Sequence, residues 1–162
     1  MIEVSDTDLR RAAAEGMDAF LAVFTDAYRR ATDDHLTAEN MACLTAPQHT
    51  LLAYTVLRDE LMEGGFCQLV QNGYGAYIFH NPVARALKGW GLDDARRIYD
   101  AHREDLERER TDDEFMAMYE QYEAFDPLEE EFIEHEEEWT ARVAAYVDGH
   151  LEEFAHVTGW EE

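Results

Sequence analysis

The stretch from residue 60 to residue 79 reads E-L-M-E-G-G-F-C-Q-L-V-Q-N-G-Y-G-A-Y-I-F and decides the fold. It contains four glycines, Gly64, Gly65, Gly73 and Gly75. A glycine pair directly after a helical pattern ends the helix, because glycine adopts a left-handed backbone without Cβ strain. Phe66, Leu69 and Val70 then repeat at the spacing of a short buried helix. We predict a tight helix–turn–helix elbow in the core.

The flanking sequence predicts further helices. One runs from residue 6 or 7 to about residue 30, and Thr45 caps the next. Thr111 and Glu114 have the spacing of a capping box, and Asp126-Pro127 begins a last helical segment that reaches Phe154. Residues 74–79 form the only β-prone run, and it is too short to make a sheet alone. We predict one all-α domain over residues 1–162, with an N-terminal helix and connector at 1–40 and a core at 44–157.

Charge sets limits on the function. Thirteen basic and 37 acidic residues give 13 − 37 = −24, while 46% hydrophobic residues argue against disorder. Such a surface repels nucleic acid and anionic membranes and favours basic partners, metal cations or plain solvation. Lys88 is the only lysine, and acid excess with scarce lysine also suits a high-salt cytoplasm or a GC-rich genome. An acidic salt-adapted domain is therefore one alternative.

The remaining bulk features point to a soluble cytoplasmic protein. No signal-peptide pattern opens the chain, and no apolar run approaches the ~18 residues of a membrane span. Cys43 and Cys67 are the only cysteines and do not form a metal-type C-x-x-C. Cys67 lies among apolar residues of the elbow, which predicts a buried, inert thiol.

A one-signed acidic segment is the main candidate for a binding surface. No lysine or arginine lies between residues 111 and 141. Like charges at i, i+4 cost about 0.2–0.5 kcal/mol per pair, which burial of Phe132 and Trp139 at about 1.5–3 kcal/mol each offsets. Folding therefore tolerates these acids without needing them, and a solvated face is the plain alternative. We predict that the partner-binding acids are Asp112, Asp113, Glu114, Glu120, Glu123, Glu130, Glu134, Glu137 and Glu138.

The elbow also resembles the signature of a small acidic DNA-mimic protein family, otherwise catalogued as a bacterial domain of unknown function. That pattern is an apolar helix, an acid-x-x-x-G-G-F-x-Q turn and an N-x-x-G stretch. Its matches here are Leu57, Glu60, Gly64, Gly65, Phe66, Gln68, Asn72 and Gly75. The resemblance covers about residues 44–154. It implies a DNA mimic that binds a basic DNA-binding protein such as a transcription factor, without direct nucleic-acid or membrane binding; a homodimer is left open.

Enzymatic alternatives depend on weaker patterns. Glu153 and His156 have E-x-x-H spacing, as in di-metal carboxylate bundles, but a second such motif is missing. His135 begins a zincin-like motif in which Trp139 replaces the second histidine. We therefore predict no catalytic residue, metal site or cofactor, and keep a metal-dependent carboxylate/histidine enzyme as an alternative. Gln68 and Asn72 are expected to bond the loop backbone around Gly73.

Overall fold

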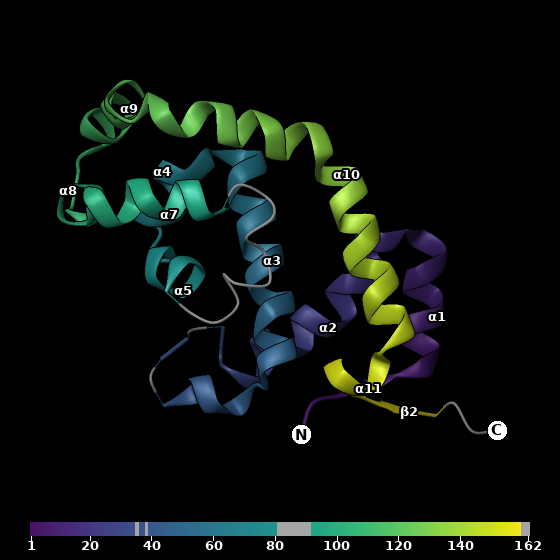
Figure 1. The fold of residues 1–162 in the computed structure, drawn as a ribbon. Helices are drawn as coiled ribbons and strands as arrows, with labels where there is room; N and C mark the ends of the chain where they lie inside the picture. The colour runs from purple at the N-terminus through teal and green to yellow at the C-terminus, as the bar shows by residue number, and fades with distance from the viewer. Residues whose placement is uncertain (35, 38, 81–91, 160–162) are drawn as a thin grey trace. The chain divides into compact units, whose positions relative to one another are not determined.

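The computed structural model describes residues 1–34, 36, 37, 39–80 and 92–159. Helices dominate these ranges, so the predicted all-α class is confirmed (Figure 1). The chain forms two compact units: a terminal unit, Met1–Leu52 with Glu137–Glu162, and a central unit, Ala53–Glu136. Helices α3 (Ala46–Glu63) and α10 (Asp126–Gly149) continue from one unit into the other. A single domain over the whole chain stays a prediction.

The terminal unit begins and ends with short strands. β1 (Glu3–Ser5) and β2 (His156–Thr158) pair in parallel, with Val4 opposite Val157. The side chain of Ser5 then accepts a hydrogen bond from the backbone N–H of Asp8 and caps the first helix. Between the strands lie α1 (Asp6–Glu15), α2 (Met17–Ala31), the 3₁₀-helix η1 (Asn40–Cys43), the ends of α3 and α10, and α11 (Leu151–Phe154).

The N-terminal helix and the strands differ from the sequence expectations. The helix predicted from residue 6 or 7 to 30 is two helices, because Gly16 adopts φ 135° between α1 and α2. Glycine makes this break inexpensive, whereas other residues rarely adopt such a backbone. The run at 74–79, expected to be too short for a sheet, is mostly helical, as α5 (Gly75–Phe79). The strands β1 and β2, which the sequence did not predict, lie near the two ends of the described chain.

Phe154 fixes the C-terminal segment inside the terminal unit. Its carbonyl oxygen accepts hydrogen bonds from the Tyr28 hydroxyl at 2.7 Å and from Nε2 of Gln48 at 3.0 Å. Its ring packs edge-on against Phe24, with centroids 6.5 Å apart. Gln48 also accepts from the backbone N–H of Thr45, the predicted cap of α3, whose hydroxyl accepts from Gln48 N. The segment that leads into β2 is therefore held from both α2 and α3.

Aromatic side chains form the core of the central unit. Phe66 stacks on Phe125 at 5.0 Å between ring centroids and lies 6.0 Å from Phe79, which stacks on Tyr99 at 4.9 Å. All four rings are buried, as are Leu69 and Val70. The shorter elements of this unit are α4 (Gly65–Gln71), α5, α7 (Leu92–Ala101), α8 (Arg103–Glu107), α9 (Asp112–Gln121) and η3 (Glu123–Phe125).

The elbow predicted after α3 is present between α3 and α4. Gly65 has φ 81°, the left-handed conformation expected for it. The backbone N–H of Phe66 donates to Oε2 of Glu129 at 2.8 Å, and the Tyr119 hydroxyl donates to the Gly64 carbonyl at 2.8 Å. Side chains from α9 and α10 therefore hold the turn between α3 and α4 in place, so four helices meet at the elbow.

Candidate functional site

The nine predicted binding acids are all exposed. Asp112, Asp113, Glu114 and Glu120 lie on α9, Glu123 on η3, and Glu130, Glu134, Glu137 and Glu138 on α10. The acids up to Glu134 belong to the central unit, whereas Glu137 and Glu138 lie just beyond its end on α10. We call the central-unit members the acidic surface: Asp112, Asp113, Glu114, Glu120, Glu123, Glu130 and Glu134.

The outward position of the α10 acids follows from helical periodicity. Phe132 is 2% exposed and packs near Tyr54, with ring centroids 6.3 Å apart. Positions three and four apart share a face, so Glu129 lies on the inner side with Phe132. Glu130 and Glu134 fall on the opposite side and remain exposed. The core residues thus orient the charges.

The charge density along this part of α10 approaches that of a nucleic-acid strand. Asp126, Glu130, Glu131 and Glu134 are the exposed acids of its central-unit part. Residues 126–136 span about 15 Å at ~1.5 Å per residue, so the helix carries one exposed acid per about 4 Å. A single DNA strand carries one phosphate per ~3.4 Å of axis. The helix and the DNA strand therefore agree in the density and in the sign of their charges.

Few of these acids are neutralised by the protein itself. Glu138 pairs with Arg142 at 2.6 Å, and Glu114 lies 3.6 Å from Arg108. Glu114 also accepts from the backbone N–H of Thr111, which lowers the pKa of its carboxyl and completes the predicted capping box. In the described ranges, the other seven predicted acids make no ion pair, and these are Asp112, Asp113, Glu120, Glu123, Glu130, Glu134 and Glu137.

Two other acids are used to build the fold. Glu129 belongs to the same acidic run, but its carboxylate accepts from Phe66 N, and burial raises its pKa. Glu60 is 9% exposed and accepts hydrogen bonds from the side-chain amides of Gln68 at 2.6 Å and Asn72 at 2.8 Å. The expectation that Gln68 and Asn72 bond the loop backbone around Gly73 is therefore wrong, because their amides donate to a buried carboxylate instead.

Two apolar side chains are exposed among the acids, a feature that sequence reasoning missed. Met116 on α9 is 67% exposed and Ile133 on α10 is 50% exposed. Helical spacing places Met116 beside Asp112, Asp113 and Glu120, at three or four residues. Single exposed apolar residues are common on protein surfaces, so only their position within the acidic surface distinguishes them.

The structure does not support the E-x-x-H alternative, which needs Glu153 and His156 on one face of a helix. Glu153 lies on α11, whereas His156 is in strand β2, so the two do not share a helix face. Glu153 accepts from the Tyr146 hydroxyl at 3.2 Å. No group of three or more histidine, cysteine, aspartate or glutamate side chains within the described ranges is arranged to hold a metal ion. Cys67 is buried, and burial raises the pKa of its thiol to about 12.

None of the helices in the described parts of the chain is both long enough and apolar enough to span a membrane. Two comparisons with known proteins gave matches. Residues 42–150 match the model of the DMP19-like protein family. The chain is also 32% identical over 127 residues to the DNA mimic protein DMP19 of Neisseria meningitidis serogroup B, covering 74% of this chain and 77% of that protein. The chain therefore belongs to the DMP19-like protein family.

Proposed function

We propose that this protein is a DNA mimic that binds the DNA-binding face of a basic protein through its acidic surface and the adjoining acids of α10, Glu137 and Glu138. The observation that carries the proposal is the row of exposed acids on α10, which the described cations leave largely uncompensated. The name of the N. meningitidis relative, a DNA mimic protein, supports the same role. The action is binding without catalysis, and it takes place in the cytoplasm, where DNA-binding proteins act.

The partner class follows from charge complementarity. A surface with one negative charge per about 4 Å attracts proteins whose own surface is built to contact phosphates with arginine and lysine. Such long-range attraction raises association rates and is screened by salt. A transcription factor satisfies this description and is the partner that we propose. Met116 and Ile133 would add apolar contacts that salt does not screen.

The test begins with affinity capture from a lysate at physiological salt, followed by titration of the captured protein. A four-fold variant changes Glu130, Glu134, Glu137 and Glu138 to glutamine. Exposed ion pairs contribute about 0.2–1 kcal/mol each, so we expect a loss of about 1–4 kcal/mol, roughly five- to several-hundred-fold in Kd. The salt dependence of binding should flatten as well, while the helical circular dichroism stays unchanged.

The matched control changes the same number of charges away from these acids, in the terminal unit. Glu15, Asp26, Asp33 and Asp148 are exposed and lie outside the acidic surface. Their amide variants should keep the partner's affinity within about twofold. Equal losses in both four-fold variants would show that only net charge matters, as for a salt-adapted acidic domain. Capture of only neutral or acidic proteins, with no effect of salt, would contradict the mimic role itself.

A further inference from the structure

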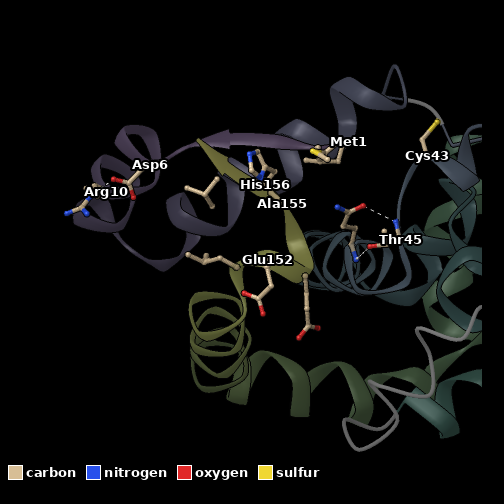
Figure 2. A pocket seen from close by; sticks show the side chains of 13 residues that line it. Met1, Asp6, Arg10, Cys43, Thr45, Glu152, Ala155 and His156 are labelled. Carbon is tan, nitrogen blue, oxygen red and sulfur yellow. Dashed lines mark hydrogen bonds and ion pairs between the residues drawn. The ribbon is translucent and has the colours of Figure 1, made fainter. Parts of the chain in front are cut away.

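A cavity in the terminal unit lies outside the acidic surface. It has a volume of about 710 Å³, and its walls come from the two residues before β1, from α1, η1, the start of α3, α11 and β2. Figure 2 shows Cys43 and Thr45 at one end, the Asp6–Arg10 pair at the other, and Glu152, Ala155 and His156 between them. Cavities that hold small ligands or peptide side chains have volumes of about 300–1,000 Å³. This one has room for more than one side chain.

The walls are fixed before any ligand arrives. The N–H of His156 donates to the Ile2 carbonyl at 2.8 Å, next to the β1–β2 pairing. Gln48 bonds both Thr45 N and the Phe154 carbonyl, and the N–H of Ala155 donates to the Leu151 carbonyl. A preformed cavity lowers the ordering cost of binding, so even a short segment can bind measurably.

The lining combines apolar surface with negative charge. Ile2, Leu151 and Val157 supply apolar walls. Asp6 is neutralised by Arg10, whose Nε lies 2.6 Å from its Oδ2. Glu152 and Glu153 also line the cavity. Within the described residues, the carboxylate of Glu153 accepts a side-chain hydrogen bond only from the uncharged Tyr146 hydroxyl. Because Arg10, the one arginine or lysine among the described lining residues, is already paired with Asp6, the carboxylates of Glu152 and Glu153 favour a ligand that has a positive head and an apolar body.

We propose that this cavity binds an arginine or lysine side chain of the basic partner, together with an apolar neighbour in the same segment. The cationic head lies at Glu152 and Glu153, and the methylene stem and the neighbour pack on Leu151 and Val157. Long basic side chains are suited to such sites because their stems are apolar while their heads are charged. The inference rests on the proposed function and gives the partner a second, more specific contact than phosphate mimicry.

The direct test uses small peptides and does not require the partner. ¹⁵N-labelled protein is titrated with acetyl-Leu-Arg-amide, and amide shifts of residues 151–157 are followed. The first control peptide replaces arginine by citrulline, which has the same shape without the charge. The second is acetyl-Gly-Arg-amide, which lacks the apolar neighbour. We expect saturable shifts at 151–157 with the first peptide and weaker binding by about three- to tenfold with either control, because exposed carboxylates contribute modestly.

Two double variants test whether the carboxylates of Glu152 and Glu153 bind the cationic head. Glu152→Gln with Glu153→Gln should weaken the Leu-Arg peptide to the level of the citrulline peptide. Glu15→Gln with Asp26→Asn, which changes the net charge equally in the same unit, should leave its affinity unchanged. The inference is overturned if the citrulline peptide binds equally well, if both double variants lose equally, or if the shifts appear on α9 and not at 151–157. Backbone amide spectra of each variant verify that the fold is retained.

Titration of the captured partner separates this inference from the proposed function. If the cavity variant binds the partner as wild type does while the four-fold α10 variant is weakened, the cavity has no such role and the mimic function stands. If the cavity variant loses affinity for the partner while Glu15→Gln with Asp26→Asn does not, the cavity contact is supported. If no basic partner is captured, the proposed function and the partner named here both fail, whatever the peptides show.

Discussion

Replacing Gly65 by alanine should destabilise the central unit more than its backbone angle alone requires. Gly65 has φ 81°, and a Cβ at this position would lie 2.5 Å from Oε2 of Glu129. A left-handed backbone costs an alanine about 1–2 kcal/mol. Displacing Glu129 also weakens its hydrogen bond from Phe66 N, and bonds to charged groups contribute about 1.5–3 kcal/mol. We therefore expect a loss of about 2–5 kcal/mol in the free energy of unfolding, measured by urea titration.

Gly73 supplies the matched control. It has φ 90°, but a Cβ there would meet nothing within 4 Å, so Gly73→Ala should cost only the backbone share of about 1–2 kcal/mol. The difference between the two variants isolates the contact with Glu129. Combining Gly65→Ala with Glu129→Ala should recover part of the difference, because the clash is then gone. Equal losses for Gly65→Ala and Gly73→Ala would refute the reasoning that Glu129 holds the elbow.

Three further predictions concern groups that the fold buries. Glu60→Gln should lower the free energy of unfolding by about 1–3 kcal/mol, because the carboxylate accepts from two amide donors, whereas one end of the glutamine amide is an NH2 that would face a donor. The exposed control Glu63→Gln should change this free energy by less than ~0.5 kcal/mol. Burial raises the pKa of Glu129, so the stability that this group contributes is complete below the ordinary glutamate pKa and is lost as the pH rises through the folded-state pKa. The free energy of unfolding of the wild type should therefore rise relative to that of Glu129→Gln as the pH falls from 7 to about 4.5. A constant difference between the two proteins would contradict this. Cys43 should react with a thiol reagent at pH 8 in the native protein while Cys67, whose pKa burial raises to about 12, should react only in urea; two fast thiols would contradict the burial.

Sequence reasoning succeeded where the determinants are local. The capping box of Thr111 and Glu114 joins residues three apart, and the left-handed conformation of Gly65 follows from its position after a helix. It failed where distant segments meet. The β1–β2 pairing joins Val4 to Val157, and strands of three residues have no alternation that periodicity can detect. Gly16 shows a third kind of failure, because a single glycine inside a helical pattern indicates either a tolerated residue or a break.

The same distinction applies to the acids. Periodicity predicted exposed carboxylates on α10, since burial of Phe132 decides which side faces solvent. It could not show that Glu129, within the same run, reaches the backbone of Phe66, because that contact joins residues 63 apart in the chain. The acids therefore look alike in the sequence but have two different roles: some hold the fold and the others face solvent. Only contacts between distant residues separate them.

This division explains how the fold and the partner can vary independently. Glu60, Gln68 and Gly65, which carried the family resemblance, are engaged in the elbow and its hydrogen bonds, so they specify the fold and not the binding partner. The exposed acids on α10 contribute nothing to the core, and their mutual repulsion costs only about 0.2–0.5 kcal/mol per pair. On the proposed function, substituting Glu130 or Glu134 should therefore weaken binding at little cost in stability. On the proposed function, the exposed acids of this chain, and not its elbow, should therefore determine which basic protein it binds.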